Sequence, residues 1–287
     1  DSGENLFAPG KTPRQNAQFL LFLSAVIKAV DEYQDLLRIS VASAGNDHRL
    51  GANEAPPAIV SMFISDELTG ILESIGDGEV YESRMPSEIF IGVDSLPHLS
   101  KDSTDRNRTS PFAFTGNKFE FRMLGSSFSI SGPNIVINAI VAESLRQFAD
   151  LLEGADNFNS ALEQLMRQTI KEHKRIIFNG NNYSDEWVKE AEGRGLLNLR
   201  STVDALPLFV NKKNIDLFTR HHIFTETEMH SRCDILLENY CKTINIEALT
   251  MIEMARREIV PAVFSYLKDV SETVYYKRSI SRSIDCF

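Results

Sequence analysis

The pattern of apolar residues changes at Gly132-Pro133, and this change limits the fold classes that the chain can adopt. Beyond it, apolar residues recur every three or four positions along most of the remaining chain, which is the period of helices that bury one face. Before it, helical patterns alternate with short apolar runs typical of buried strands. We therefore expect an α+β fold with a mixed first part and a second, largely helical unit.

Apolar periodicity and helix-capping residues predict the individual elements. Thr12 followed by Pro13 predicts a helix start, because a threonine N-cap and a proline at the first helical position are both favoured. Six apolar residues between Phe19 and Val30 then form a continuous stripe. Pro261 predicts a kink in the last helix. Further helices are expected at 33–39, 65–75, 135–152, 158–177, 184–192, 212–219 and 226–277, strands at 59–64 and 88–93, and a turn at 76–78.

The composition fits a soluble globular protein with a large core. Of the 287 residues, 43% are hydrophobic and 24% are charged, and the formal net charge is -10. An acidic chain without a basic run argues against nucleic acid or an anionic membrane as the main partner. No apolar stretch approaches the ~20 residues that span a bilayer. The three cysteines lack the spacing of a zinc site or a disulfide framework, so we expect a cytoplasmic protein.

Residues 46–57 form a polar segment between two apolar ones, and their composition predicts an irregular loop. The segment carries charged and amide side chains, an imidazole, a glycine and two prolines, without the period of a helix or a strand. Loops anchored between buried elements often carry binding residues. The alternative is a solvated connection whose charges face water, which is the commoner role of a loop of this composition.

A second polar constellation covers residues 106–122. At its end, Lys118, Glu120 and Arg122 alternate with phenylalanines, so a strand would place cation, carboxylate and cation in a row, about 6.6 Å apart, on one face. Such a row is typical of a polyanion or metal site. The alternative is a half-buried edge strand with a solvated face.

Both segments resemble the glutamine synthetases, and Asn-Asp-His-Arg-Leu-Gly-Ala-Asn-Glu-Ala-Pro-Pro resembles their type III branch. These enzymes carry Asn, Arg-Leu and Glu-Ala-Pro in one loop, and an Asn-Arg pair before a strand with Glu-x-Arg. Asn107-Arg108 and residues 120–122 match the second pattern. The resemblance covers nearly the whole chain. It implies that residues 1–153 are the C-terminal part of the catalytic domain, an antiparallel sheet with flanking helices, and that residues 154–287 are the helical type III extension, truncated.

The resemblance implies that the first segment binds and covers glutamate. Asn46 and Arg49 would contact this substrate together with Arg122, because a guanidinium pairs both oxygens of a carboxylate. Glu54 would be catalytic, since it would close over the site and take a proton from bound ammonium.

The second segment, by the same resemblance, binds ATP and a divalent metal. Arg108 would hold phosphate oxygens as a catalytic and ATP-binding residue, and Lys118 stands where the family has a basic residue on the ATP side. Type I enzymes carry a further arginine where this chain has Ala113, so another basic residue, such as Lys118, would share the binding of the phosphate groups. Glu120 would ligate Mg²⁺ or Mn²⁺, hard cations that prefer carboxylate oxygens.

The implied reaction joins ammonia to L-glutamate at the expense of ATP. The glutamate carboxylate attacks the γ-phosphorus, and ammonia displaces phosphate from the resulting γ-glutamyl phosphate. Cations must absorb the charge of two reacting anions, and a lid must exclude water. The resemblance also implies a homo-oligomer of stacked rings in the full-length protein, with neither nucleic acid nor membrane as a partner.

Two earlier motifs of the family are missing ahead of the polar segment 46–57: Gly-Ser-Gly-x-His does not occur in this sequence, and Glu-x-Glu occurs only at 190–192 and 226–228, within the predicted helical part. We therefore expect a fragment that lacks metal ligands and cannot synthesise glutamine alone. One alternative is a γ-glutamyl ligase that uses another amine, since the same arginines would serve both reactions. Another is that the helical part is a non-catalytic assembly or regulatory module.

Overall fold

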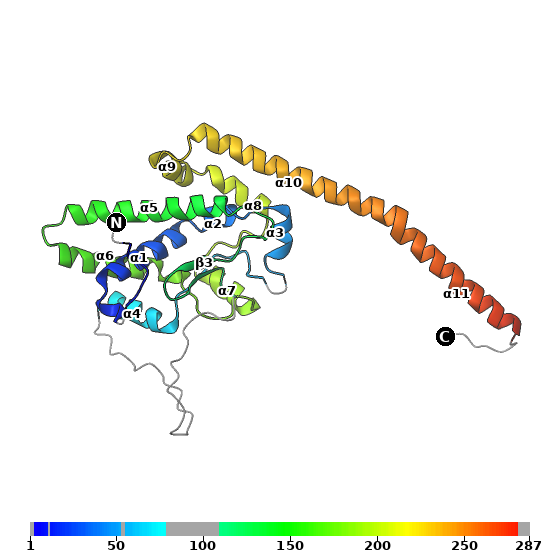
Figure 1. Cartoon of the computed structure of the whole chain (residues 1–287), viewed down its shortest axis with the longest axis horizontal. Helices are drawn as coiled ribbons and strands as arrows, with labels where there is room; N and C mark the ends of the chain where they lie inside the picture. Colours follow the sequence, from blue (N-terminus) through cyan, green and yellow to red (C-terminus); the bar gives the residue numbers. More distant parts are fainter. Residues whose placement is uncertain (1–2, 11, 53–54, 79–108, 281–287) are drawn as a thin grey trace, which may run out of the picture. The chain divides into compact units, whose positions relative to one another are not determined.

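The computed structural model of the chain describes residues 3–10, 12–52, 55–78 and 109–280. The chain forms two units, residues 1–236 and 237–287, which are described separately. The elements labelled in Figure 1 are, in chain order, η1 Pro13–Gln15, α1 Ala17–Glu32, α2 Gln34–Ile39, α3 Ala44–Arg49, β1 Met62–Phe63, α4 Asp66–Asp77, β2 Phe112–Phe114, β3 Phe119–Phe121, α5 Ser131–Glu153, α6 Phe158–His173, η2 Lys174–Ile176, α7 Asp185–Gly193, α8 Thr202–Ala205, η3 Leu206–Val210, α9 Lys212–Arg220, α10 Glu226–Met254, η4 Ala255–Ile259 and α11 Val260–Ile280.

The first long helix begins at Asn16, so the prediction that Thr12 caps it is wrong. The Asn16 side chain accepts a hydrogen bond of 3.0 Å from the Phe19 amide, which gives one of the free amides of the first turn a partner. Thr12 instead begins a single 3₁₀ turn, since its carbonyl oxygen accepts from the Gln15 amide. The predicted apolar stripe is confirmed: Phe19 and Val30 are buried, as are the apolar residues between them that form it.

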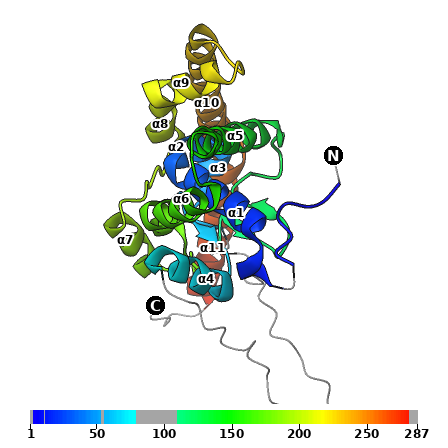
Figure 2. The ribbon, with the colours of Figure 1, turned by 90° about the vertical axis from the view of Figure 1, so that its left-hand side faces the viewer.

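Helix α1 lies at the centre of the first unit. It packs against α5 and α6, and α6 packs in turn against α4 (Figure 2). This position explains why α1 is apolar over a wide arc, because two helices cover it from different directions. The predicted helices at 33–39, 65–75, 184–192 and 212–219 are confirmed as α2, α4, α7 and α9.

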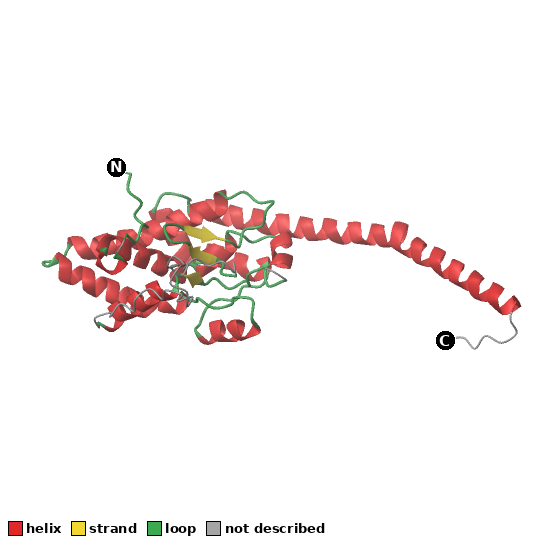
Figure 3. Cartoon of the chain, turned by 60° about the horizontal axis from the view of Figure 1, so that its bottom comes forward, coloured by secondary structure: helices red, strands yellow, loops and turns green. Residues whose placement is uncertain are grey.

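A three-stranded sheet lies among the helices, so the expected α+β class is confirmed (Figure 3). The strand order is β1-β2-β3. Strands β2 and β3 are antiparallel, as expected, with Ala113 opposite Glu120, whereas β1 pairs with β2 in parallel, with Met62 opposite Phe112. The sheet is therefore mixed, because β1 and β2 are separated by α4 and are not joined by a hairpin.

The polar segment 46–57 begins inside a helix, so the prediction of an irregular loop is wrong for its first four residues. Helix α3 ends at Arg49, and its N-cap is Ser43, whose side chain accepts from the Asn46 amide at 3.2 Å. The helix has no apolar stripe. Its polar side chains hold it in place through hydrogen bonds to other segments of the chain. A helix of six residues is marginal in isolation, so these contacts supply its stability.

The second unit consists of the end of α10, the π-helical segment η4 and helix α11. The helix type changes next to Pro261, where the sequence predicts a kink, since the π-helical segment η4 ends directly before Val260. Proline lacks the amide that would continue the hydrogen-bond ladder. Large apolar side chains such as Phe264 and Tyr266 are exposed in this unit. Within the described residues, no helix combines the length and the apolar character needed to cross a bilayer.

One predicted element lies outside the described residues, namely the strand at 88–93. The boundary expected between residues 153 and 154 concerns a division of the family and stays a prediction. In this structure, α5 and α6 on either side of that boundary pack against each other within the first unit.

Candidate functional site

The Asn46 side chain holds α3 against the segment that follows β3. Its amide nitrogen donates to the carbonyl oxygens of Val41 at 2.8 Å and Met123 at 2.9 Å. The side chain is 1% exposed. Both amide hydrogens of an asparagine are used in this arrangement, so its donors are satisfied within the protein.

Arg49, one turn later on α3, reaches the same segment. Its Nη1 atom donates to the Met123 carbonyl oxygen at 2.9 Å, and its Nη2 atom donates to the Arg122 carbonyl oxygen at 3.0 Å. Nη1 also lies 3.2 Å from Oδ1 of Asn46. The planar guanidinium therefore holds two consecutive carbonyl groups at once, which a lysine ammonium on a flexible stem does not reproduce.

The predicted row of charges on β3 is confirmed. The Lys118 ammonium lies 3.5 Å from one oxygen of Glu120, and the Arg122 guanidinium lies 3.1 Å from the other. On the opposite face, the Phe119 ring packs against Phe112 and Phe114 with centroid distances of 5.3 and 5.1 Å. The alternation of β3 thus places one carboxylate between two cations above an aromatic layer.

The two cations beside Glu120 favour its ionised form. The hydrogen bonds from Arg122 hold the pKa of Glu120 below its ordinary value, against the effect of partial burial, and the charges of Arg122 and Lys118 act in the same direction. Its side chain is 41% exposed, so the carboxylate stays accessible. A charged, accessible carboxylate suits a metal ligand.

A metal ion would need further ligands beyond Glu120. Divalent cations take about six or more oxygen ligands. Within the ranges that the structure describes, no three His, Cys, Asp or Glu side chains gather to hold a metal. Glu120 supplies a single carboxylate, with a cation near each of its oxygens, so the described residues do not make a complete metal site.

The structure brings five of the seven predicted site residues into one connected set. Asn46 and Arg49 contact the backbone at 122–123, Arg122 contacts Glu120, and Lys118 lies at the outer end of the row. The other two predictions, Glu54 and Arg108, lie outside the described residues.

A residue that the sequence did not single out, Asp47, anchors the other side of α3. Its carboxylate accepts from the Arg38 guanidinium at 2.7 Å and from the backbone amide and hydroxyl of Thr202 at 2.6 and 2.9 Å. One sequence signal pointed to it. Arg38 stands in the apolar run 36–39, and a cation on a buried helix requires a partner of opposite charge.

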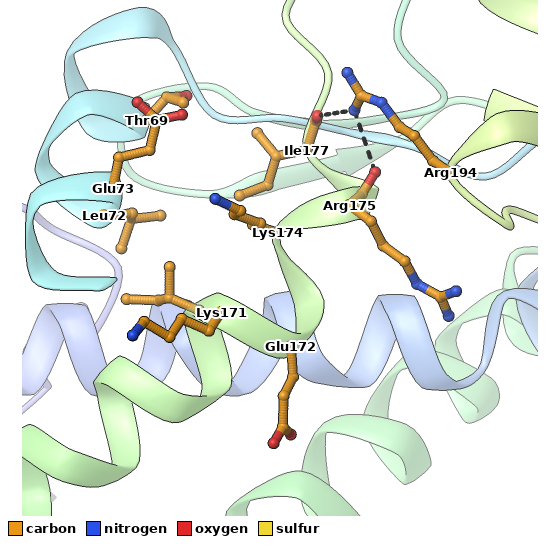
Figure 4. Close-up of a pocket in the computed structure, with 10 residues that line it drawn as sticks. Thr69, Leu72, Glu73, Lys171, Glu172, Lys174, Arg175, Ile177 and Arg194 are labelled. Atoms are coloured by element: carbon orange, nitrogen blue, oxygen red, sulfur yellow. Dashed lines mark hydrogen bonds between the residues drawn. The ribbon is translucent and has the colours of Figure 1, made fainter. Parts of the chain in front are cut away.

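A pocket of about 380 Å³ lies between α4, α6, η2 and Arg194. Figure 4 shows the Arg194 guanidinium donating to the carbonyl oxygens of Arg175 and Ile177, at 3.2 and 2.8 Å. The Nε atom of Arg175 donates to Asp31 at 2.9 Å. These two cations therefore hold helix ends together, and none of the predicted site residues lines the pocket.

Comparisons with known proteins point to one family. A family model described as "Glutamine synthetase C-terminal domain" matches residues 161–278. Over 98% of its length, the chain is 48% identical to a protein of Butyrivibrio fibrisolvens named "Glutamine synthetase". Over 96% of its length, it is 47% identical to the "Type-3 glutamine synthetase" of Dictyostelium discoideum, and over 98% it is 41% identical to a "Glutamine synthetase" of Bacteroides fragilis. The chain covers 40%, 38% and 39% of these relatives.

Proposed function

Because the chain belongs to the glutamine synthetase family, we propose that it is part of an enzyme that ligates ammonia to L-glutamate with ATP. The type III branch is supported by the identity to the Dictyostelium discoideum relative. The chain spans about two fifths of the length of these relatives, so the activity belongs to a longer polypeptide in this proposal.

One observation carries the proposal. The guanidinium of Arg49 hydrogen-bonds to the backbone of Arg122, whose own side chain pairs with Glu120. Residues that are separated by 73 positions in the sequence thus meet at one end of β3. The resemblance assigns three residues at this place, Arg49, Arg122 and Asn46, to glutamate.

We assign roles to the chain's residues from their chemistry. Arg122, with Asn46 and Arg49 behind it, orients the glutamate side chain, because a guanidinium pairs two carboxylate oxygens. Lys118 and Arg108 offset the charge of the phosphate groups, since two anions must approach each other during phosphoryl transfer.

Three further roles complete the assignment. Glu54 accepts the proton that ammonium must lose before it can attack the acyl phosphate. Glu120 contributes a carboxylate to a Mg²⁺ or Mn²⁺ site whose other ligands come from elsewhere in the enzyme. A bound divalent ion there would supply positive charge for the transferring phosphoryl group.

We further propose that the helical part, residues 154–287, is the type III extension and that it supports a homo-oligomer of stacked rings in the cytoplasm. The exposed apolar side chains of the second unit favour a role in assembly, because exposed apolar surface of this extent usually marks an interaction site.

The test compares two polypeptides. The 287-residue chain and a full-length family polypeptide that contains it are each given glutamate, ammonium, ATP and Mg²⁺, and glutamine and ADP are measured. We expect glutamine from the longer polypeptide and no γ-glutamyl transfer from the 287-residue chain. Competition between ammonium and added polyamines distinguishes an ammonia ligase from a ligase for another amine. A longer polypeptide that forms no glutamine would overturn the proposed function.

A further inference from the structure

Helix α3 is held from two sides by adjacent residues. Asn46 faces the segment after β3, where its amide bonds to the Met123 carbonyl oxygen, and Asp47 faces α8, where its carboxylate bonds to Thr202. Successive residues of a helix point about 100° apart, so neighbouring positions reach different parts of the structure. A helix this short has little stability of its own, and its position depends on these contacts.

On the Asp47 side, the two partners of the carboxylate are buried, and one of its hydrogen bonds comes from a cation. Arg38 is 1% exposed, and besides Asp47 it donates to the carbonyl oxygens of Leu199 at 2.8 Å and Arg200 at 3.3 Å. Thr202 is also 1% exposed and donates to Asp47 twice, through its backbone amide and its hydroxyl. The Asp47 carboxylate, whose side chain is 12% exposed, has one cation and two neutral donors around it, so it is held more rigidly than a fully exposed ion pair.

The two sides connect distant parts of the chain. Thr202 lies within residues 161–278, the segment that matches the family's C-terminal domain model. From Thr202, the contacts run through Asp47 into α3, and from α3 through Arg49 to the backbone of Arg122. The helical part therefore reaches the predicted glutamate-binding residues through one short helix.

We propose that Asp47 is a positioning residue for the glutamate site, and that Thr202 fixes α3, and with it Arg49 and the backbone of Arg122, through the Asp47 carboxylate. This inference rests on the proposed function, because it takes Arg49 and Arg122 as substrate-binding residues. Asp47 itself does not touch the substrate.

The decisive variant is Thr202→Val, which keeps the shape of the side chain and removes one donor to Asp47. Thr202→Ser restores the hydroxyl. Thr250→Val is the matched control, since the exposed Thr250 hydroxyl bonds within its own helix, to the Ile246 carbonyl oxygen. Each variant is made in the 287-residue chain and in the full-length family polypeptide that contains it.

The first measurement is amide hydrogen exchange in the 287-residue chain. In Thr202→Val we expect exchange at Asp47 and Leu50, whose amides close the turns of α3, to accelerate about fivefold, the factor that corresponds to one neutral hydrogen bond. Exchange within α1 should stay unchanged, and Thr202→Ser should restore protection in α3. Unaltered exchange in α3 of Thr202→Val would overturn the inference.

The second measurement is steady-state kinetics of the full-length polypeptide. We expect Thr202→Val to raise KM for glutamate about three- to tenfold, with kcat within twofold and KM for ATP unchanged, because the loss is in the position of the glutamate-binding groups. An unchanged KM for glutamate in an active enzyme would overturn this inference alone. A wild-type polypeptide that forms no glutamine would overturn the proposed function, and this inference with it.

Discussion

The Nη2 atom of Arg49 lies 3.0 Å from the carbonyl oxygen of Arg122, and this hydrogen bond joins α3 to the residue that directly follows β3, 73 positions later. The contact uses the backbone of Arg122, so the Arg122 side chain remains directed to Glu120. Arg49 thus holds the backbone of the residue whose side chain, the Arg122 guanidinium, pairs with Glu120.

Substituting Arg49 by lysine should loosen the end of β3. A lysine ammonium does not span both the Arg122 and Met123 carbonyl groups, so we expect Arg49→Lys to lower the free energy of unfolding by about 1–2 kcal/mol. Urea denaturation followed by circular dichroism measures this loss. Arg256→Lys in the exposed helical unit serves as a control and should change stability by less than about 0.5 kcal/mol. Equal effects of the two variants would contradict the prediction.

Two glycine substitutions should change the free energy of unfolding in opposite directions. Gly78 adopts φ +76° at the C-terminus of α4, a left-handed conformation that strains a residue with a Cβ, so Gly78→Ala should destabilise by about 1–2 kcal/mol. Gly45 lies inside α3 with nothing within 4 Å of an added Cβ. Gly45→Ala should therefore stabilise the protein by up to about 1 kcal/mol. Thermal unfolding of both variants tests the opposite signs.

Glu143 should make the first unit sensitive to acid. Burial by itself raises the pKa of this carboxyl group, but hydrogen bonds from Arg146, Gln147 and His221 outweigh it and lower the pKa to about 2. The unfolded value is about 4.3, so the stabilisation is complete above that pH and is lost as the pH falls towards 2. Its size is on the order of 2–3 kcal/mol.

The variant Glu143→Gln tests this dependence. It should lower stability at pH 7 and flatten the fall in unfolding free energy between about pH 5 and pH 2, because no proton binds at this position on unfolding. Glu238→Gln, which alters an exposed pair with Lys242, should leave the fall unchanged. An equally steep fall in wild type and Glu143→Gln would rule out Glu143 as its source.

Trp187 should be a major contributor to packing around α7. It is 1% exposed and stacks on Phe178 with a centroid distance of 3.7 Å. Trp187→Ala should therefore cost about 3–5 kcal/mol, since the surroundings cannot fill so large a cavity. Tyr183→Ala, at a side chain that is 40% exposed, should cost less than about 1 kcal/mol. Similar losses for the two variants in urea denaturation would refute the packing role.

The sequence predicted the elements whose stability comes from an apolar face. Helix α1 could be predicted because the apolar residues from Phe19 to Val30 recur with the helical period. Helix α4 could be predicted because Ser65 is an N-cap residue directly before a periodic segment. The charge row of β3 followed from alternation alone. In each case the determining information lies within a few consecutive residues.

Helix α3 could not be predicted in this way. Its polar side chains have partners at Met123 and Thr202, 77 and 155 positions away, and nothing in the local sequence shows those partners. The misplaced N-cap of α1 has a related cause, since Thr12-Pro13 and Asn16 both carry start signals and the structure uses them for two successive turns. Only the family resemblance linked residues 46 and 49 with residue 122, and it did so without a geometry.

The wide turn at Ala255–Ile259 changes how the last helix should be compared with other sequences. A π-helical turn accommodates an extra residue, and each residue of a helix accounts for about 100° of rotation. Side chains after Val260 are therefore out of phase with a heptad register counted from α10. An alignment that continues the heptad register of α10 into α11 therefore assigns the α11 side chains to the wrong helical face. A mutational scan of α11 should assign its helical faces independently of those of α10.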